Sequence, residues 1–138
     1  MMVSQENILN YLPHRQPFVM IDNLVSVNEE IFESEFLVRE DNLLVEDGLF
    51  QACGLMENIA QTCAAGFGFL DRSENEEPKM GFIGAISKLE VFELPPVNSV
   101  IITTVIPTHQ LGNIFLVKGQ NSLEGRKLLE CEMKIVVN

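Results

Sequence analysis

The chain has 138 residues, 46% hydrophobic and 21% charged, which is typical of one globular domain and excludes a two-domain enzyme or a disordered chain. Its 20 acidic and 9 basic residues give a net charge of -11 without a basic block, so neither nucleic acid nor a membrane surface is an expected partner. Cys53, Cys63 and Cys131 lie in apolar segments and cannot all pair, which predicts small buried side chains in a reduced, cytoplasmic protein. The first ten residues do not have the pattern of a signal peptide.

The first third of the chain predicts a short helix and two strands. Ser4 and the apolar residues after it indicate a short capped helix that ends at Pro13. Residues 18–27 predict a first strand. Residues 32–38 predict a second, half-buried strand, because apolar residues alternate there with glutamates. The polar residues 41–48 predict a loop.

A long apolar helix is predicted over residues 49–70. This segment contains no cation and one anion, Glu57, and apolar residues occupy almost every helical face. Such a helix must be buried on all sides or must span a membrane. Because Gln51, Asn58 and Gln61 near its middle would be costly in lipid, we expect a buried helix of a water-soluble domain. The residues expected to be buried on it are Met56, Ile59, Cys63 and Phe67.

The remainder of the chain predicts antiparallel strands. Their ranges are 80–92, which is one strand or two joined near Gly84, then 100–106, 114–121 and 129–137. Turn-forming residues separate them at 95–96, 111–113 and 124–125, and a polar turn is expected around His109. One helix wrapped by a curved antiparallel sheet is an α+β architecture, here a single domain over residues 1–138.

This order of elements, with an apolar central helix, resembles the hot-dog fold. The string LPHRQPFVMID at residues 12–22 resembles the opening of the 3-hydroxyacyl-(acyl-carrier-protein) dehydratases. The string ENIAQ at 57–61 resembles their central-helix signature, and LPPV at 94–97 resembles the turn before their middle strands. The resemblance covers nearly the whole chain. It is nearest to the small dehydratase-like proteins of aryl-polyene and flexirubin pigment clusters.

One family motif is missing from the loop before the helix. Active relatives carry a His-Phe-Pro segment there, with the histidine fourteen residues before the acidic residue of the helix. In this chain that position is Leu43, and residues 42–45 contain no histidine. The resemblance therefore assigns the acidic catalytic residue to Glu57 and the family histidine to no residue.

Dehydration of a 3-hydroxyacyl thioester requires a base for the proton on carbon 2 and an acid for the departing hydroxyl. Glu57 is the candidate acid, because Cys53, Ala60 and Ala64 on the same helical face favour its protonated form. These three residues and Gln61, one turn further on, are the candidate substrate-binding residues. The alternatives are that Glu57 only pairs with a neighbouring strand and that Gln61 only fills a dimer seam.

His14 is the other catalytic candidate. Prolines on either side restrict its backbone, so a structural role in a turn is the first expectation. The alternative is that it enters the pocket and substitutes for the missing histidine. The loop before the helix, here called the approach loop, could also supply the missing catalytic partner of Glu57. Its polar residues are Asp41, Asn42, Glu46 and Asp47. No Cys or His pair has the spacing of metal ligands, so neither a metal nor a cofactor is expected.

The resemblance also implies the partners. An acyl thioester or acyl carrier protein is expected at an apolar tunnel, with Lys88, Arg126 or Lys127 near its mouth to meet an acidic carrier. Because a wrapped helix leaves one apolar sheet edge unpaired, we expect a homodimer or a heterodimer with a paralogous dehydratase.

Three functions follow from this resemblance. The first is a dehydratase-like enzyme that acts on or binds acyl thioesters in fatty-acid or polyene-type biosynthesis. The second is a non-catalytic partner subunit of an active dehydratase. The third is a hot-dog acyl thioesterase in which the helix carboxylate alone activates water.

Overall fold

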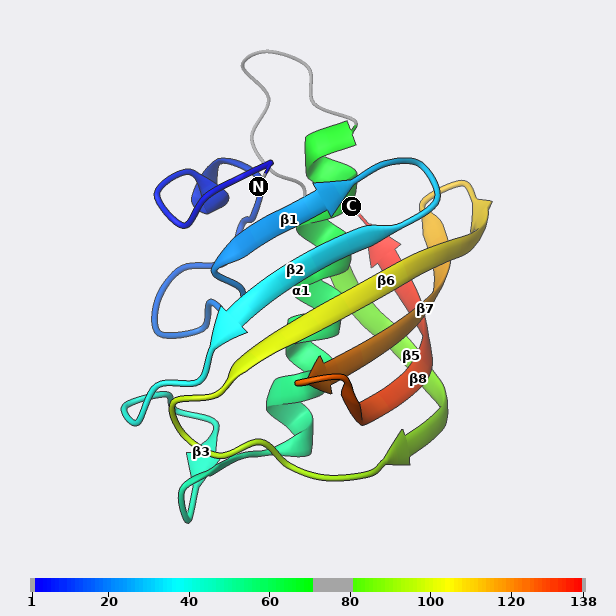
Figure 1. Ribbon diagram of the computed structural model, residues 1–138. Coiled ribbons are helices and arrows are strands. Elements are labelled where there is room, and N and C mark those ends of the chain that lie inside the picture. Colours follow the sequence, from blue (N-terminus) through cyan, green and yellow to red (C-terminus); the bar gives the residue numbers. More distant parts are fainter. Residues whose placement is uncertain (1, 71–80, 138) are drawn as a thin grey trace.

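In the computed structural model, which describes residues 2–70 and 81–137, one long helix lies against a six-stranded antiparallel sheet (Figure 1). The sheet order is β1-β2-β6-β7-β8-β5, and the helix is α1 (Ala52–Leu70). This arrangement confirms the predicted α+β architecture. The strands are β1 (Asn23–Val27), β2 (Phe32–Leu37), β5 (Gly81–Val91), β6 (Val100–Leu111), β7 (Ile114–Leu123) and β8 (Arg126–Val137). Residues 71–80, which include the first residue of the predicted strand 80–92, lie outside the described residues.

The core lies between the helix and the inner face of the sheet. Along β2 and β8 every second residue is buried, as the alternating sequence pattern predicts. Leu55, Ile59 and Cys63 of α1 face these strands and are fully buried. Gly119 on β7 allows the helix to approach closely, because a Cβ atom there would collide with the side chain of Ile59.

The helix is not buried on all sides, which corrects the prediction from its composition. Met56 and Phe67 are half-buried and Cys53 is exposed. The sheet covers one side of α1, and the edge strand β5 is exposed along most of its length. A stripe of side chains therefore stays partly open to solvent. We call it the open stripe of α1, and it comprises Cys53, Met56, Glu57, Ala60 and Ala64.

The predicted strand over residues 18–27 begins only at Asn23. The reason is that side chains of the helix satisfy the backbone of the residues before it. The N–H of Met20 donates to Oε1 of Gln61 (2.6 Å), and its carbonyl accepts from Nδ2 of Asn58 (2.6 Å). The segment is thus docked on α1 instead of being paired in the sheet.

Two short strands lie where a loop and the helix start were predicted. β3 (Val45–Glu46) pairs with β4 (Leu49–Phe50) in a small hairpin just before α1. The backbone N–H of Phe50 donates to the carbonyl of Pro95 (2.9 Å), which ties this hairpin to the main domain. The helix therefore starts at Ala52 instead of residue 49.

Two smaller predictions are also wrong. His109 lies within β6, where it is paired with Leu116 of β7, because cross-strand pairing extends this hairpin past the expected polar turn. The predicted N-terminal helix is a single 3₁₀ turn, η1 (Ile8–Asn10). Ser4 accepts a backbone hydrogen bond from Asn7 (2.9 Å) in the turn before it.

Among the described residues, no helix combines the length and apolar character that crossing a membrane requires.

Candidate active site

A pocket of about 350 Å³ lies between the open stripe of α1 and the beginning of β5. Most of its wall is apolar, with two titratable side chains at one side. The small side chains of Ala60 and Ala64 on α1 leave room for this pocket, and residues of β5 and β8 form its other wall. Its lining residues are His14, Glu57, Ala60, Ala64, Gly81, Phe82, Ile83 and Ile135.

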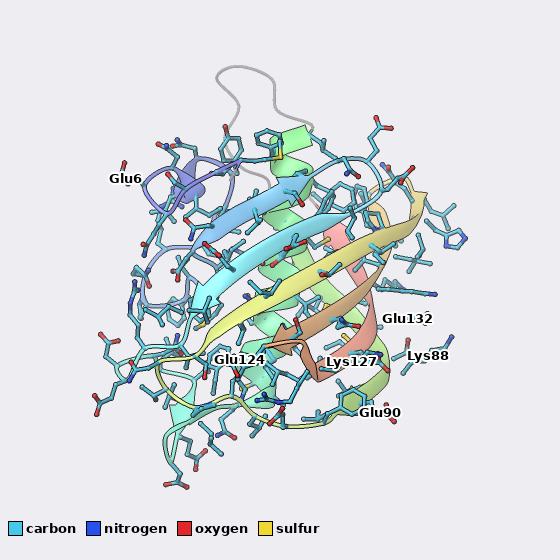
Figure 2. All side chains as sticks on the ribbon, viewed as in Figure 1. Glu6, Lys88, Glu90, Glu124, Lys127 and Glu132 are labelled. Carbon is cyan, nitrogen blue, oxygen red and sulfur yellow. The ribbon has the colours of Figure 1, made fainter. Side chains whose placement is uncertain are left out.

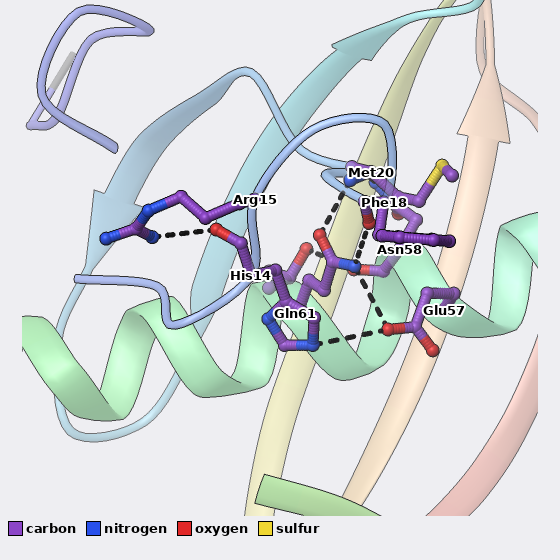
Figure 3. Close-up of polar contacts among 8 residues, drawn as sticks. His14, Arg15, Phe18, Met20, Glu57, Asn58 and Gln61 are labelled. Atoms are coloured by element: carbon purple, nitrogen blue, oxygen red, sulfur yellow. Dashed lines mark hydrogen bonds and ion pairs between the residues drawn. The ribbon is translucent and has the colours of Figure 1, made fainter. Parts of the chain in front are cut away.

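Glu57 presents its carboxyl group to this pocket with one oxygen held in place (Figure 3). Its Oε1 accepts a hydrogen bond from Nε2 of Gln61 (3.0 Å) and lies 3.5 Å from Nε2 of His14. Within the described residues, Oε2 has no hydrogen-bond partner. The side chain is 34% exposed, and its surroundings are apolar on the side of Ala60 and Ala64 and polar on the other. One carboxyl oxygen is thus available to a ligand.

His14 reaches the pocket from the chain segment that precedes β1. This is the alternative placement considered for it, since the ring faces Glu57 and lines the pocket. Its turn is held by Arg15, which donates to the carbonyl oxygens of Leu12 and His14 itself (both 2.7 Å). The Nδ1 atom is buried and, within residues 2–70 and 81–137, has no hydrogen-bond partner.

The charge state of His14 follows from these surroundings. Burial is the main cause that holds the pKa of the imidazole below its ordinary value. The nearby Glu57 carboxylate raises this pKa in part, and the Arg15 cation lowers it further. Protonation of both ring nitrogens would also leave a buried Nδ1–H without an acceptor. The ring is therefore neutral at pH 7, and the tautomer with its proton on Nε2, facing Glu57, is the favoured one.

This lowered pKa gives a measurable pH dependence of stability. Below about pH 6.5 the unfolded chain binds a proton at His14 more readily than the folded chain does, so acid lowers the free energy of unfolding. We expect the loss between about pH 7.5 and about pH 5.5 to be smaller in His14→Gln than in the wild type. Urea denaturation at both pH values measures it, and equal losses in the two proteins would contradict the assignment.

Gln61 and Cys53 do not line the pocket. Gln61 is fully buried beneath it and makes three hydrogen bonds. Cys53 is exposed on the first turn of α1, one turn before Glu57. The expectation that all three cysteines are buried is therefore wrong for Cys53. Its side chain projects from the side of the helix that the sheet leaves uncovered.

The three thiols should differ in reactivity. Burial raises the pKa of Cys63 to about 12, and burial together with the nearby Glu132 raises the pKa of Cys131 to about 11. Because the thiolate is the reactive form, we expect a disulfide reagent at about pH 8 to modify one thiol per folded chain, that of Cys53. Counting thiols before and after denaturation tests this. Rapid reaction of all three in the folded protein would contradict it.

The cations expected to meet a carrier protein are paired with glutamates. Figure 2 labels two of these cations, Lys88 and Lys127, together with Glu132. Lys88 contacts Glu132 (3.3 Å), Arg126 contacts Glu93 (2.8 Å), and Lys127 contacts Glu130 (3.0 Å). None of the three cations lines the pocket. Lys88 instead borders a second hollow, of about 410 Å³, over strands β6, β7 and β8.

The other polar candidates also lie away from the pocket. The approach-loop residues Asp41, Asn42, Glu46 and Asp47 are not among its lining residues. Asn42 caps its own turn by accepting a hydrogen bond from the N–H of Leu44 (2.8 Å). In the described part of the chain, no group of three or more His, Cys, Asp or Glu side chains is arranged to hold a metal ion.

The residues that close the pocket from β5 and β8 were not predicted from the sequence. Phe82, Ile83 and Ile135 lie in strands that are far from Glu57 along the chain. Their alternation indicated strands, but no local signal indicated that these strands face the open stripe of α1. Only the strand order, which places β5 beside β8 at the sheet edge, brings them to Glu57.

The sheet wrapped around one helix, with a carboxylate in a pocket beside that helix, defines a hot-dog-fold protein. The sequence model of the ApeP-like family, described as ApeP dehydratase, matches residues 6–105. The chain therefore belongs to the ApeP-like dehydratase family.

The chain is also similar to individual proteins in sequence or in fold. The chain is 23% identical to the 3-hydroxyacyl-(acyl-carrier-protein) dehydratase FabZ of Wolinella succinogenes, over 99% of this chain and 97% of that protein. The dehydratase heterocomplex ApeI:P from Xenorhabdus doucetiae has a similar fold, with a TM-score of 0.86, 18% identity and coverage of 95% and 90% of the two chains. A hypothetical thioesterase with coenzyme A from Streptococcus pneumoniae is more distant, with a TM-score of 0.64, 11% identity and 84% coverage of each chain.

Proposed function

We propose that this dehydratase-family protein binds 3-hydroxyacyl thioesters in the Glu57 pocket and eliminates water from them, with Glu57 as the catalytic residue. The observation that carries the proposal is the carboxyl group itself. Its Oε1 is held by Gln61, while Oε2 is free of partners in the described residues, and the Glu57 side chain lines a mostly apolar pocket. The small side chains of Ala60 and Ala64 leave room there for the acyl chain.

In the proposed reaction Glu57 carries one proton from carbon 2 to the hydroxyl group. Its Oε2 takes the proton, and the electron pair of the C–H bond forms the double bond between carbons 2 and 3. The bond from carbon 3 to the hydroxyl oxygen breaks, and Glu57 gives the same proton to that oxygen. The products are a 2-enoyl thioester and water, and the carboxylate is restored.

His14 supports Glu57 in this proposal and does not accept the proton from carbon 2. A neutral ring with its proton on Nε2 has no lone pair facing the pocket, and Nδ1 is buried. The ring instead presents a donor to Glu57 at 3.5 Å, a distance that can shorten when substrate is bound. We therefore assign the chemistry to Glu57 and a supporting role to His14.

We also propose that a second subunit covers the pocket. The edge strand β5 exposes Phe82 (53%) and Leu89 (45%), and Phe92 just beyond it is 48% exposed. An unpaired edge strand with apolar side chains is an aggregation hazard unless another chain pairs with it. The open stripe of α1 lies beside this edge, so a partner paired with β5 would also border the pocket.

The partner is either a second copy or a paralogous dehydratase. The approach loop of this chain contains no histidine, and a paralogue that carries the His-Phe-Pro segment would supply one. The similarity of fold to a dehydratase heterocomplex supports the paralogue. In that assembly the chain would be a cytoplasmic partner subunit for acyl-carrier-protein thioesters, with little activity alone.

The test is an assay of the purified chain with 3-hydroxyacyl thioesters, alone and after co-expression with such a paralogue. Enoyl thioester formation is followed by absorbance, and thiol release is followed in the same reactions. Dehydration without thiol release is the expected result. Thiol release without an enoyl product would identify a thioesterase instead. Light scattering of each sample gives the assembly, and a monomer at micromolar concentration in both would overturn the two-subunit proposal.

A further inference from the structure

The edge of β1 that does not pair with β2 is covered by residues near the N-terminus (Figure 1). Val3 forms an antiparallel bridge with Leu24. The Leu24 N–H donates to the Val3 carbonyl (2.9 Å), and the Val3 N–H donates to the Leu24 carbonyl (3.1 Å). Further along β1, the N–H of Val27 donates to Sδ of Met2 (3.0 Å). We call residues 2–5 the N-terminal strap.

The strap is also held by Gln5 and by a buried side chain. The backbone N–H of Gln5 donates to Oδ1 of Asn23 (2.7 Å), and its Nε2 donates to Oδ1 of Asp22 (3.4 Å). The Val3 side chain is 4% exposed and belongs to the hydrophobic core. The strap is therefore packed as part of the domain.

The sequence of β1 contains few of the features that keep an edge strand from pairing with another chain. Edge strands are commonly protected by charged residues or by proline. The five residues of β1, NLVSV, include neither. The strap protects this edge instead, because it occupies the N–H groups of Leu24 and Val27 that a further strand would use. In the described part of the chain, the opposite edge strand, β5, pairs only with β8.

From this arrangement we infer that β1 is a second pairing edge for another copy of this chain, and that the strap keeps it closed. If both edges were open, β5 of one copy would pair with β1 of the next, and repetition of this contact would extend the sheet without end. With β1 closed, only β5 is left, and two chains joined there form a closed assembly. This last consequence rests on the proposed subunit at β5, whereas the closing of β1 does not.

The test releases the strap with Val3→Asp, because an unpaired carboxylate is too costly to bury at this position. In dilute solution, amide hydrogen exchange at Leu24 should be about 10- to 100-fold faster than in the wild type. The amide of Val38, which donates to the Ser99 carbonyl (2.9 Å), should exchange as before. Val3→Ala is the matched control, because it keeps the backbone hydrogen bonds of the strap, and its Leu24 exchange should rise less than about 3-fold.

Light scattering at increasing protein concentration gives the second result. The mean mass of Val3→Asp should rise with concentration beyond that of the wild type, and the Leu24 amide should become protected again in the largest assemblies. That renewed protection would identify β1 as the surface that pairs. Growth that leaves Leu24 unprotected, equal growth in Val3→Ala, or an unprotected Leu24 without growth would overturn the inference.

A double variant, Met2→Ala with Gln5→Ala, decides the question if Val3→Asp does not fold. Both residues are exposed, so their replacement removes side-chain contacts of the strap at little cost to the core. Leu24 exchange should rise about 3- to 10-fold, with a smaller growth in mass, and no change in either would contradict the inference. If the wild type is a monomer, the proposed subunit at β5 fails, but the exchange and mass of these variants still decide whether the strap closes β1.

Discussion

Glu57→Gln should lower kcat for dehydration by about 10²- to 10⁴-fold when the chain is assayed with its partner subunit. The amide has nearly the shape of the carboxyl group, but it cannot take the proton from carbon 2 or return it to the hydroxyl. The side chain is 34% exposed, so the folded structure should tolerate the change. Enoyl formation measured under saturating substrate gives kcat, and circular dichroism checks the fold.

His14→Gln is the control that separates the two pocket residues. Because His14 supports Glu57 and does not take the proton, its replacement should cost less than about 10-fold in kcat. A loss in His14→Gln as large as that in Glu57→Gln would show that the two residues act as a catalytic pair. Undiminished turnover in Glu57→Gln would overturn the site.

The largest effect on stability is expected from Asn58→Leu, because Asn58 lies at the centre of a buried polar network. Its Nδ2 donates to the carbonyl of Met20 (2.6 Å), and its Oδ1 accepts hydrogen bonds from Thr103 and from Nδ2 of Asn121 (3.0 Å). All three partner groups are buried. Leucine would leave the Met20 carbonyl unpaired and remove one acceptor from each of the other two. We expect unfolding to become easier by about 3–5 kcal/mol.

Urea denaturation of Asn58→Leu measures this free energy of unfolding. Thr103→Val is the comparison, because it removes only the hydrogen bond that Thr103 donates to Asn58 and the one that it accepts from Nδ2 of Asn121. It leaves Met20 and Asn121 paired to Asn58. Its expected cost is about 1–2 kcal/mol. If Asn58→Leu costs no more than Thr103→Val, the network does not contribute as proposed.

The sequence by itself determined the long helix, the strands β2 and β8, and the acidic candidate. Alternation of apolar and polar residues predicted β2 and β8, because a sheet with one buried face requires a period of two. The apolar run around Glu57 predicted α1, and a lone carboxylate within it marked the site. Both signals are local, and neither depends on what lies across the fold.

Only the tertiary structure decided how those elements share their hydrogen bonds and surfaces. The run before β1 has the composition of a strand, but amides of α1 satisfy Met20, so the segment docks on the helix and brings His14 to Glu57. Likewise, the composition of α1 shows that it is apolar but not which side the sheet leaves open. That side depends on strand order, which leaves β5 at an edge and opens a pocket beside Glu57. Contacts between residues far apart along the chain carry no local pattern, so sequence periodicity could not reveal them.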